Sequence, residues 1–209
     1  NRIMKLWNNK NSINKKTDLF TVGKDLYYDL FLAQYDCQAS IAHAKMLKKI
    51  GVFSKNELNK IITELEKIKE KSEKGDLLIE DKFEDIHSKI EYELTQKLGD
   101  LGKKIHTGRS RNDQILVAIQ LYLKKEISDI KLLAKTFFDL LIDLAKKNKN
   151  YLMPGYTHFQ IAMPSSFGLW FSAYAESLID DVEFLNLAKF FVNQNPLGSA
   201  AGFGTSFNI

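Results

Sequence analysis

The chain has 209 residues, of which 44% are hydrophobic and 27% are charged, and its formal net charge is +4. This composition is typical of a globular protein with a real core, and no apolar run approaches the roughly 20 residues of a membrane-spanning helix. The lysines are scattered between acids instead of forming one basic tract, which argues against nucleic-acid binding.

Cysteine content and the start of the sequence bear on the compartment. The single cysteine, Cys37, has no partner within the chain for a disulfide. No charged-then-apolar leader with a small-residue cleavage site opens the sequence. Both features predict a cytoplasmic location.

Hydrophobic spacing predicts three helices in the first half of the chain. Apolar residues recur every three or four positions over 24–49, and Gly51 follows as a stop signal. A second helix begins at Ser54, because a glutamate three residues later, Glu57, completes a capping-box signature ahead of an apolar stripe. A third helix is predicted over 84–98, before a glycine-containing segment.

Two much longer helices are predicted over residues 113–147 and 165–194. The first contains no glycine or proline, and at 1.5 Å per residue it would be about 50 Å long. Such a helix is too long for one small domain, so it indicates an elongated bundle shared between subunits, in which the two helices run antiparallel. No convincing alternating strand pattern and no repeat of 20–50 residues occurs, so the predicted fold class is all-α.

The segment HTGRSRNDQ, residues 106–114, contains two of the only three arginines in this lysine-rich chain. Its central residues precede a predicted helix: Ser110, Arg111 and Asn112. A helix N-terminus offers free amides and positive potential, and a guanidinium binds a carboxylate in a bidentate fork that lysine cannot reproduce. The segment therefore indicates anion binding. In the alternative, Asp113 only caps the helix and the arginines pair with acids such as Glu84 or Asp85.

Histidine is the second source of candidate chemistry, with four residues in the chain. His43 lies within an apolar helix pattern and is expected to be structural. The others occur in polar segments near helix ends or loops: His87, His106 and His158. His158 belongs to GYTHFQ, predicted as a loop, where it can move a proton near neutral pH while Thr157 or Gln160 orients it or holds a substrate. A turn histidine bonded to the backbone is the alternative.

Patterns typical of metal or phosphate sites do not occur. There is no HExxH motif, no paired cysteine spacing and no EF-hand loop. The GSAAGFG segment near the end neither follows a predicted strand nor contains a GK[ST] element, which favours a structural loop. We expect no metal ion.

Four segments, in this order, resemble the argininosuccinate lyase family of the fumarase and aspartase superfamily: EDIHS, HTGRSRNDQ, MPGYTHFQ and NPLGSAAGFGT. The resemblance extends from Met4 to Ile209. Fumarase and aspartase also carry a Ser-x-Asn-Asp element, but arginine between serine and asparagine, followed by Asp and Gln, is typical of the argininosuccinate lyase family.

The resemblance implies a fold and an activity. The fold would be all-α, with a small N-terminal helical domain over 1–111 and the first long helices of an elongated bundle over 112–209. The activity would be reversible β-elimination of argininosuccinate to arginine and fumarate, by a carbon–nitrogen lyase of arginine biosynthesis without a metal or organic cofactor. The enzyme would be a homotetramer whose sites combine segments of different subunits, with neither nucleic acid nor a membrane as partner.

The resemblance also assigns roles to residues. Two would be catalytic: Thr157 and His158. Seven would bind substrate: Asp25, His87, Thr107, Ser110, Arg111, Asn112 and Gln160. Asp25 departs from the pattern, because the family usually has a serine near this position.

A further signature of the family, a mobile Gly-Ser-Ser-x-Met-Pro loop with the serine base, does not occur in these 209 residues. We therefore expect an N-terminal portion of the enzyme that is inactive alone. The alternatives are a sister enzyme of the adenylosuccinate lyase type, a non-catalytic structural homologue and a helical nucleic-acid binder. Arg111 argues against the first, and the presence of Asn112, Thr157 and His158 argues against the second.

Overall fold

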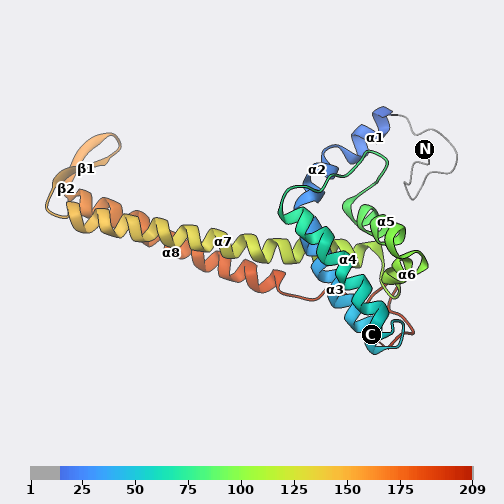
Figure 1. Cartoon of the computed structure of the whole chain (residues 1–209). Helices are drawn as coiled ribbons and strands as arrows, with labels where there is room; N and C mark the ends of the chain where they lie inside the picture. The colour runs from blue at the N-terminus through green and yellow to red at the C-terminus, as the bar shows by residue number, and fades with distance from the viewer. Residues whose placement is uncertain (1–14, 209) are drawn as a thin grey trace. The chain divides into compact units, whose positions relative to one another are not determined.

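The computed structural model describes residues 15–208 (Figure 1). The helices are α1 (Lys15–Val22), α2 (Asp25–Asp29), α3 (Ala33–Lys49), α4 (Lys55–Glu73), α5 (Ile86–Leu98), α6 (Asp100–Lys103), α7 (Arg111–Asn148) and α8 (Phe167–Val192). The described residues also form two short 3-10 helices, η1 (Leu30–Leu32) and η2 (Lys104–His106), and one hairpin of the strands β1 (Leu152–Thr157) and β2 (Gln160–Ser166). The all-α class is confirmed. Within the described residues, no helix is both long enough and apolar enough to cross a membrane.

Contacts divide the chain into two compact units. The first contains the residues up to Tyr122 and those from Asn195 onward, and the second is Leu123–Gln194. Helix α7 contributes residues to both units. The domain boundary expected between residues 111 and 112 stays a prediction about the domains of the whole protein.

The core of the first unit lies between α3, α4 and α5. Its fully buried side chains come from all three helices and include Cys37, Leu47, Ile61, Leu65, Ile90 and Leu94. The capping box of α4 is confirmed, because the Glu57 amide donates to Ser54 Oγ at 3.2 Å and the Ser54 amide donates to Glu57 Oε2 at 2.8 Å. The apolar residues that follow this cap at helical spacing form the face of α4 that is buried in the core.

The single helix predicted over 24–49 is wrong in one respect, because the chain forms α2, η1 and α3 in succession. At the end of α2, Asp29 Oδ2 accepts a hydrogen bond from the Ile86 amide at 3.1 Å. This contact ties the end of α2 to the start of α5. Hydrophobic periodicity within 24–49 cannot reveal a contact with a residue so distant in the sequence.

The second unit is built on α7 and α8, which lie side by side and run antiparallel, as predicted (Figure 1). Lys124 of α7 donates to Asn193 at 2.7 Å, whereas Lys131, seven residues later, donates to Asn186, seven residues earlier. This opposite numbering along the two helices is the pattern of an antiparallel pair.

The irregular loop predicted between these helices is wrong, because the segment forms the antiparallel hairpin of β1 and β2. The pairing runs from Leu152 opposite Ser166 to Thr157 opposite Gln160, with an irregularity between Pro154 and Tyr156. Most residues on both strands are exposed, so no face alternates between apolar and polar. The strand signal is therefore missing from the sequence.

Candidate active site

Reciprocal hydrogen bonds cap the N-terminus of α7 in the first unit. The Ser110 amide donates to Asp113 Oδ2 at 2.8 Å, and the Asp113 amide donates to Ser110 Oγ at 3.4 Å. Asp113 thus takes part in capping, as the open alternative proposed, but from within the first turn. The next amides, those of Arg111 and Asn112, have no carbonyl partner in the helix, as at any helix N-terminus. They form the positive end of the helix dipole.

Arg111 is half-buried and lies among polar groups of the protein itself. Its Nη1 donates to Gln114 Oε1 at 3.3 Å. Its Nε lies 3.8 Å from Asp85 Oδ2 and its Nη2 lies 3.6 Å from Glu91 Oε2. The pairing with Asp85 that the alternative anticipated is therefore present, but both ion pairs are longer than hydrogen bonds. The Nε atom is buried and has no hydrogen-bond acceptor among the described residues.

Arg109 is buried, with only 6% of its surface exposed. Its Nη2 donates to Ser40 Oγ at 3.1 Å, whereas its Nε finds no acceptor within residues 15–208. Burial lowers the pKa of Arg109, and the charge of Asp36 is the largest opposing influence. Two neighbouring guanidinium groups therefore each carry a buried N–H that lacks an acceptor, which is rare in folded proteins.

A buried polar network lies behind residues 106–114, which we call the arginine loop, and centres on Asp36 of α3, which is 0% exposed. Its carboxylate accepts from Ser40 Oγ at 3.1 Å and from Gln114 Nε2 at 3.0 Å, and it lies 2.9 Å from His87 Nδ1. Burial alone would raise the pKa of Asp36, but the hydrogen bond and charge of His87, with the charge of Arg109, lower it. We call Asp36, Ser40, His87, Arg109 and Gln114 the Asp36 network.

The environment expected for His87 is wrong, because its side chain is buried and only 1% exposed. An ionised carboxylate can only accept, so the Nδ1 atom facing Asp36 carries the hydrogen. Any contact of His87 with a substrate must therefore use the opposite ring nitrogen. The polar segment EDIHS gave no sign of burial because the partner, Asp36, lies 51 residues earlier in the sequence.

His43 has the structural role expected of it. It is 5% exposed, and its Nε2 donates to the Thr107 carbonyl at 2.9 Å. Burial lowers the pKa of His43 to about 4, with a further contribution from the charge of Arg109. The neutral ring therefore anchors the backbone at the entry to the arginine loop, next to Thr107. Burial also lowers the pKa of the neighbouring His106.

A cavity of about 290 Å³ opens beside this loop within the first unit. Its lining comes from α3, the arginine loop and the segment after α8: Ala42, His43, Met46, Gly108, Arg109, Asn195, Leu197 and Gly198. Ser199 Oγ in that segment donates to Asp113 Oδ1 at 3.2 Å, which ties it to the first turn of α7. The structural loop expected for GSAAGFG is thus joined to the arginine loop.

Thr157, His158 and Gln160 belong to the hairpin turn of the second unit, where all three are exposed. His158 and Phe159 have φ angles of 50° and 61°, the left-handed conformation that two-residue hairpin turns require. Glycine or asparagine usually occupies such positions, and a phenylalanine there is strained. Strained backbone concentrates at functional sites, so the turn is consistent with a functional role for His158.

The structure thus brings one group of predicted site residues into the first unit and another into the second. The first unit holds His87, Thr107, Ser110, Arg111 and Asn112, with Asp25 exposed at the start of α2. The hairpin holds the other three. The sequence interpretation missed Asp36 and Ser40, whose signal was a polar pair four residues apart inside an apolar helix. Among residues 15–208, no group of three or more His, Cys, Asp or Glu side chains is arranged to hold a metal ion.

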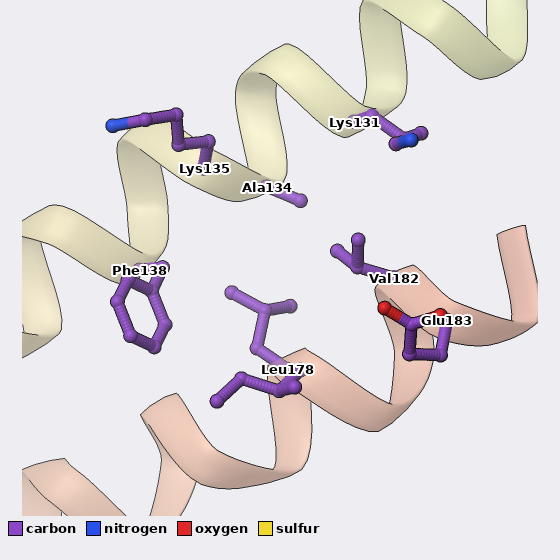
Figure 2. A pocket seen from close by; sticks show the side chains of 8 residues that line it. Lys131, Ala134, Lys135, Phe138, Leu178, Val182 and Glu183 are labelled. Carbon is purple, nitrogen blue, oxygen red and sulfur yellow. The ribbon is translucent and has the colours of Figure 1, made fainter. Parts of the chain in front are cut away.

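A second cavity, of about 320 Å³, lies between α7 and α8 in the second unit. Figure 2 shows Phe138 of α7 and Leu178 and Val182 of α8 pointing into the space between the helices. Its lining contains none of the predicted site residues and is mostly apolar. This cavity is a gap between two packed helices, and Lys131, Lys135 and Glu183 are the charged residues of its lining.

Comparison with known proteins assigns the fold to a family. A family model described as "Lyase" matches residues 12–209, and the chain belongs to this family. It is 50% identical over 205 residues to the argininosuccinate lyase of Parabacteroides distasonis and 52% identical to that of Bacteroides fragilis. Each match covers 98% of this chain but 46% of the relative. The chain therefore spans about half the length of the curated relatives it matches.

Solved structures agree with this fold. A variant of EDDS lyase with bound fumarate superposes with a TM-score of 0.73, and the match covers 89% of this chain and 38% of that one. A Brucella melitensis protein described as fumarate lyase:delta crystallin also gives 0.73, over 93% and 48% of the two chains. Their identities of 24% and 16% establish a shared fold and leave the chemistry to the residues themselves.

Proposed function

We propose that the protein containing this chain is an argininosuccinate lyase, a carbon–nitrogen lyase that reversibly eliminates fumarate from argininosuccinate and releases arginine. One observation carries the proposal: an identity of 50–52% to curated argininosuccinate lyases that extends over 98% of the chain. The capped helix N-terminus with its two guanidinium groups supports it, because the leaving fumarate carries two carboxylates.

The arginine loop would hold the succinyl carboxylates. Ser110, Arg111 and Asn112 lie at the positive end of α7, and the ion pairs of Arg111 with protein acids are long enough for a substrate carboxylate to displace them. Thr107 and His87 would line the same site, and Gln160 and Asp25 would contact the rest of the substrate.

The elimination requires two proton movements. A base removes a proton from the carbon next to a carboxylate, and the electron pair moves onto that carboxylate, which becomes an aci-carboxylate dianion. Arg111 and the first amides of α7 would stabilise this charge. The electron pair then forms the carbon–carbon double bond while the carbon–nitrogen bond breaks, and the departing nitrogen takes a proton. Thr157 would bond the substrate, and His158 would transfer a proton or hold the group that does.

The catalytic base would be a serine in a loop that these 209 residues do not contain. This loop would correspond to a part of the relatives that the present chain does not cover. The chain alone is then expected to give no fumarate above the spontaneous rate. The same gene read to its stop codon is expected to be active, and we call this longer product the extended chain. Fumarate released by the purified 209-residue chain would contradict this part of the proposal.

The proposed enzyme is a cytoplasmic homotetramer of arginine biosynthesis that needs no metal or organic cofactor. Many large apolar side chains of α7 and α8 are exposed in this single chain: Leu132, Leu133, Phe137, Leu140, Phe184, Leu187, Phe190 and Phe191. Such a surface favours association with further helices. Light scattering should give the mass of four extended chains, whereas a stable monomer would contradict the assembly.

The substrate is tested by parallel assays of fumarate release with argininosuccinate and with adenylosuccinate. We expect the extended chain to act on argininosuccinate only, because the arginine between Ser110 and Asn112 is typical of that family. Fumarate from adenylosuccinate, identified with its nucleotide product, would assign the chain to the sister enzyme.

A further inference from the structure

The two guanidinium groups of the arginine loop share one buried carboxylate, and each reaches it through a single intermediate side chain. Arg111 Nη1 donates to Gln114 Oε1, and Gln114 Nε2 donates to Asp36. Arg109 Nη2 donates to Ser40 Oγ, and Ser40 Oγ donates to Asp36 Oδ1. The same carboxylate accepts from His87 Nδ1. Asp36 itself is fully buried, so it cannot contact a substrate.

We propose that Asp36 is the positioning residue of the carboxylate-binding loop: it fixes the amide orientation of Gln114 that holds Arg111, and it supplies the negative charge that keeps Arg109 buried. The role in substrate binding rests on the proposed function. The role in holding the arginines concerns this chain's own contacts and can be tested without any activity.

The first part of the role follows from donor and acceptor chemistry. Both oxygens of Asp36 accept from Gln114 Nε2 at 3.0 Å, so the amide nitrogen must face Asp36 and the amide oxygen must face Arg111. An amide in place of the carboxylate would present its own N–H groups to Gln114. Gln114 would then turn its oxygen toward residue 36 and its N–H groups toward Arg111, and two donors would face each other.

The second part of the role follows from charge. A guanidinium as buried as that of Arg109 requires a compensating charge nearby, because an isolated buried ion is strongly unfavourable. The charges of Glu91 and Asp113 also favour the charged form of Arg109, but the charge of Asp36 has the largest effect of the three. Without the Asp36 charge, Arg109 is expected to leave its site and reach solvent.

An exchange of the two groups separates this role from simple packing. Asp36→Asn removes the carboxylate and keeps the shape, and Gln114→Glu places a second carboxylate beside Asp36. The double variant moves the carboxylate to position 114, where one oxygen can accept from the new amide at position 36 and the other from Arg111. It therefore restores the charge and the pattern of donors and acceptors that links residues 36, 114 and 111. Leu47→Ala is the matched control, since Leu47 is fully buried on the same helix but lies outside the Asp36 network.

The first readout is the accessibility of the arginines in the extended chain. The protein is treated with a dicarbonyl reagent such as phenylglyoxal, with N-acetylarginine as the reference, and modification of Arg109 and Arg111 is followed by mass spectrometry. Asp36→Asn is expected to raise the rate at Arg109 by at least about tenfold, whereas Gln114→Glu keeps the Asp36 charge and should not raise it. The double variant should return to within about threefold of wild type, and Leu47→Ala should lower the melting temperature without changing this rate well below melting.

The second readout is inhibition of the lyase reaction by each of its products. The single variants should raise the inhibition constant for fumarate by about tenfold, with that for arginine changed less than twofold, because only the carboxylate site is disturbed. A loss of folding alone would lower the amount of active enzyme without separating these two constants. The double variant should recover tight fumarate inhibition.

The outcomes separate the two proposals. If the unaltered extended chain releases no fumarate, the proposed function fails, and the modification rates still decide the role of Asp36. Wild-type modification rates in a folded Asp36→Asn variant would overturn the inference. If Asp36→Asn does not fold, the inference requires that the double variant folds and resembles wild type. A double variant that also fails to fold, or that combines the defects of the single variants, would overturn the proposed role of Asp36.

Discussion

His43 should make the stability of the protein fall as pH falls from about 6.5 to 4. In the unfolded chain the imidazole takes a proton near its ordinary pKa of 6.5, whereas in the folded chain burial lowers the pKa of His43 to about 4. Between these values the unfolded state binds more protons, so acid favours unfolding, and the effect is complete below pH 4. A shift of this size corresponds to at most about 3 kcal/mol of the free energy of unfolding.

The matched perturbation is His43→Gln, since an amide nitrogen can still donate to the Thr107 carbonyl but cannot titrate. At pH 7.5 the variant should be less stable than wild type by about 1 kcal/mol, through imperfect packing and hydrogen bonding. As pH falls to 4 the difference should close and reverse, because only wild type pays for protonation. His106 is also acid-sensitive in both proteins, and its charge contributes to the lowered pKa of His43, so part of the difference includes the interaction between the two rings.

The assay is denaturant unfolding of both proteins at several pH values between 7.5 and 4, with the free energies subtracted at each pH. A difference that stays constant over this range would show that His43 is not held neutral, and would refute the burial argument.

Three further substitutions test local features, each by the free energy of unfolding. Ser54→Ala should cost about 1 kcal/mol, because it removes the hydroxyl that caps α4, and equal stability would contradict the cap. Gly102→Ala should cost about 1–3 kcal/mol, because its Cβ would lie 2.6 Å from the Leu94 carbonyl, whereas Gly202→Ala, with no atom within 4 Å, should be close to neutral. Phe159→Gly should stabilise by about 1 kcal/mol, because it relieves a φ of 61° without losing packing; Phe203→Gly, equally exposed but at ordinary φ, should not.

Local signals in the sequence were sufficient for most of the helices. The Ser54 cap and the stripe behind it lie within one segment, and the long apolar pattern of α7 needs no partner to be recognised. The antiparallel pairing of α7 and α8 was predicted from the helix lengths, which indicate an elongated bundle. These features depend on residues within a few turns of each other, and the structure confirms them.

The features that the sequence did not reveal depend on contacts between distant residues or on exposed backbone. The β1–β2 hairpin has no buried face, so its strands carry no alternating pattern. His87 lies in a polar segment, and only its contact with Asp36 explains its burial. Asp36 itself occupies a helix that looks apolar, and its role depends on Gln114, 78 residues later. A buried charge is compensated in three dimensions, which a one-dimensional pattern does not contain.

The roles proposed for the arginine loop and the hairpin turn meet in a single assay. Fumarate formation from argininosuccinate is measured by ultraviolet absorbance with the extended chain, Arg111→Lys and His158→Ala. We expect activity in the unaltered protein, a loss of at least about tenfold when the bidentate guanidinium becomes a point charge, and a loss of about 10²- to 10⁴-fold without the imidazole. A folded, assembled extended chain that forms no fumarate, or an Arg111→Lys variant as active as wild type, would contradict the proposed carboxylate site.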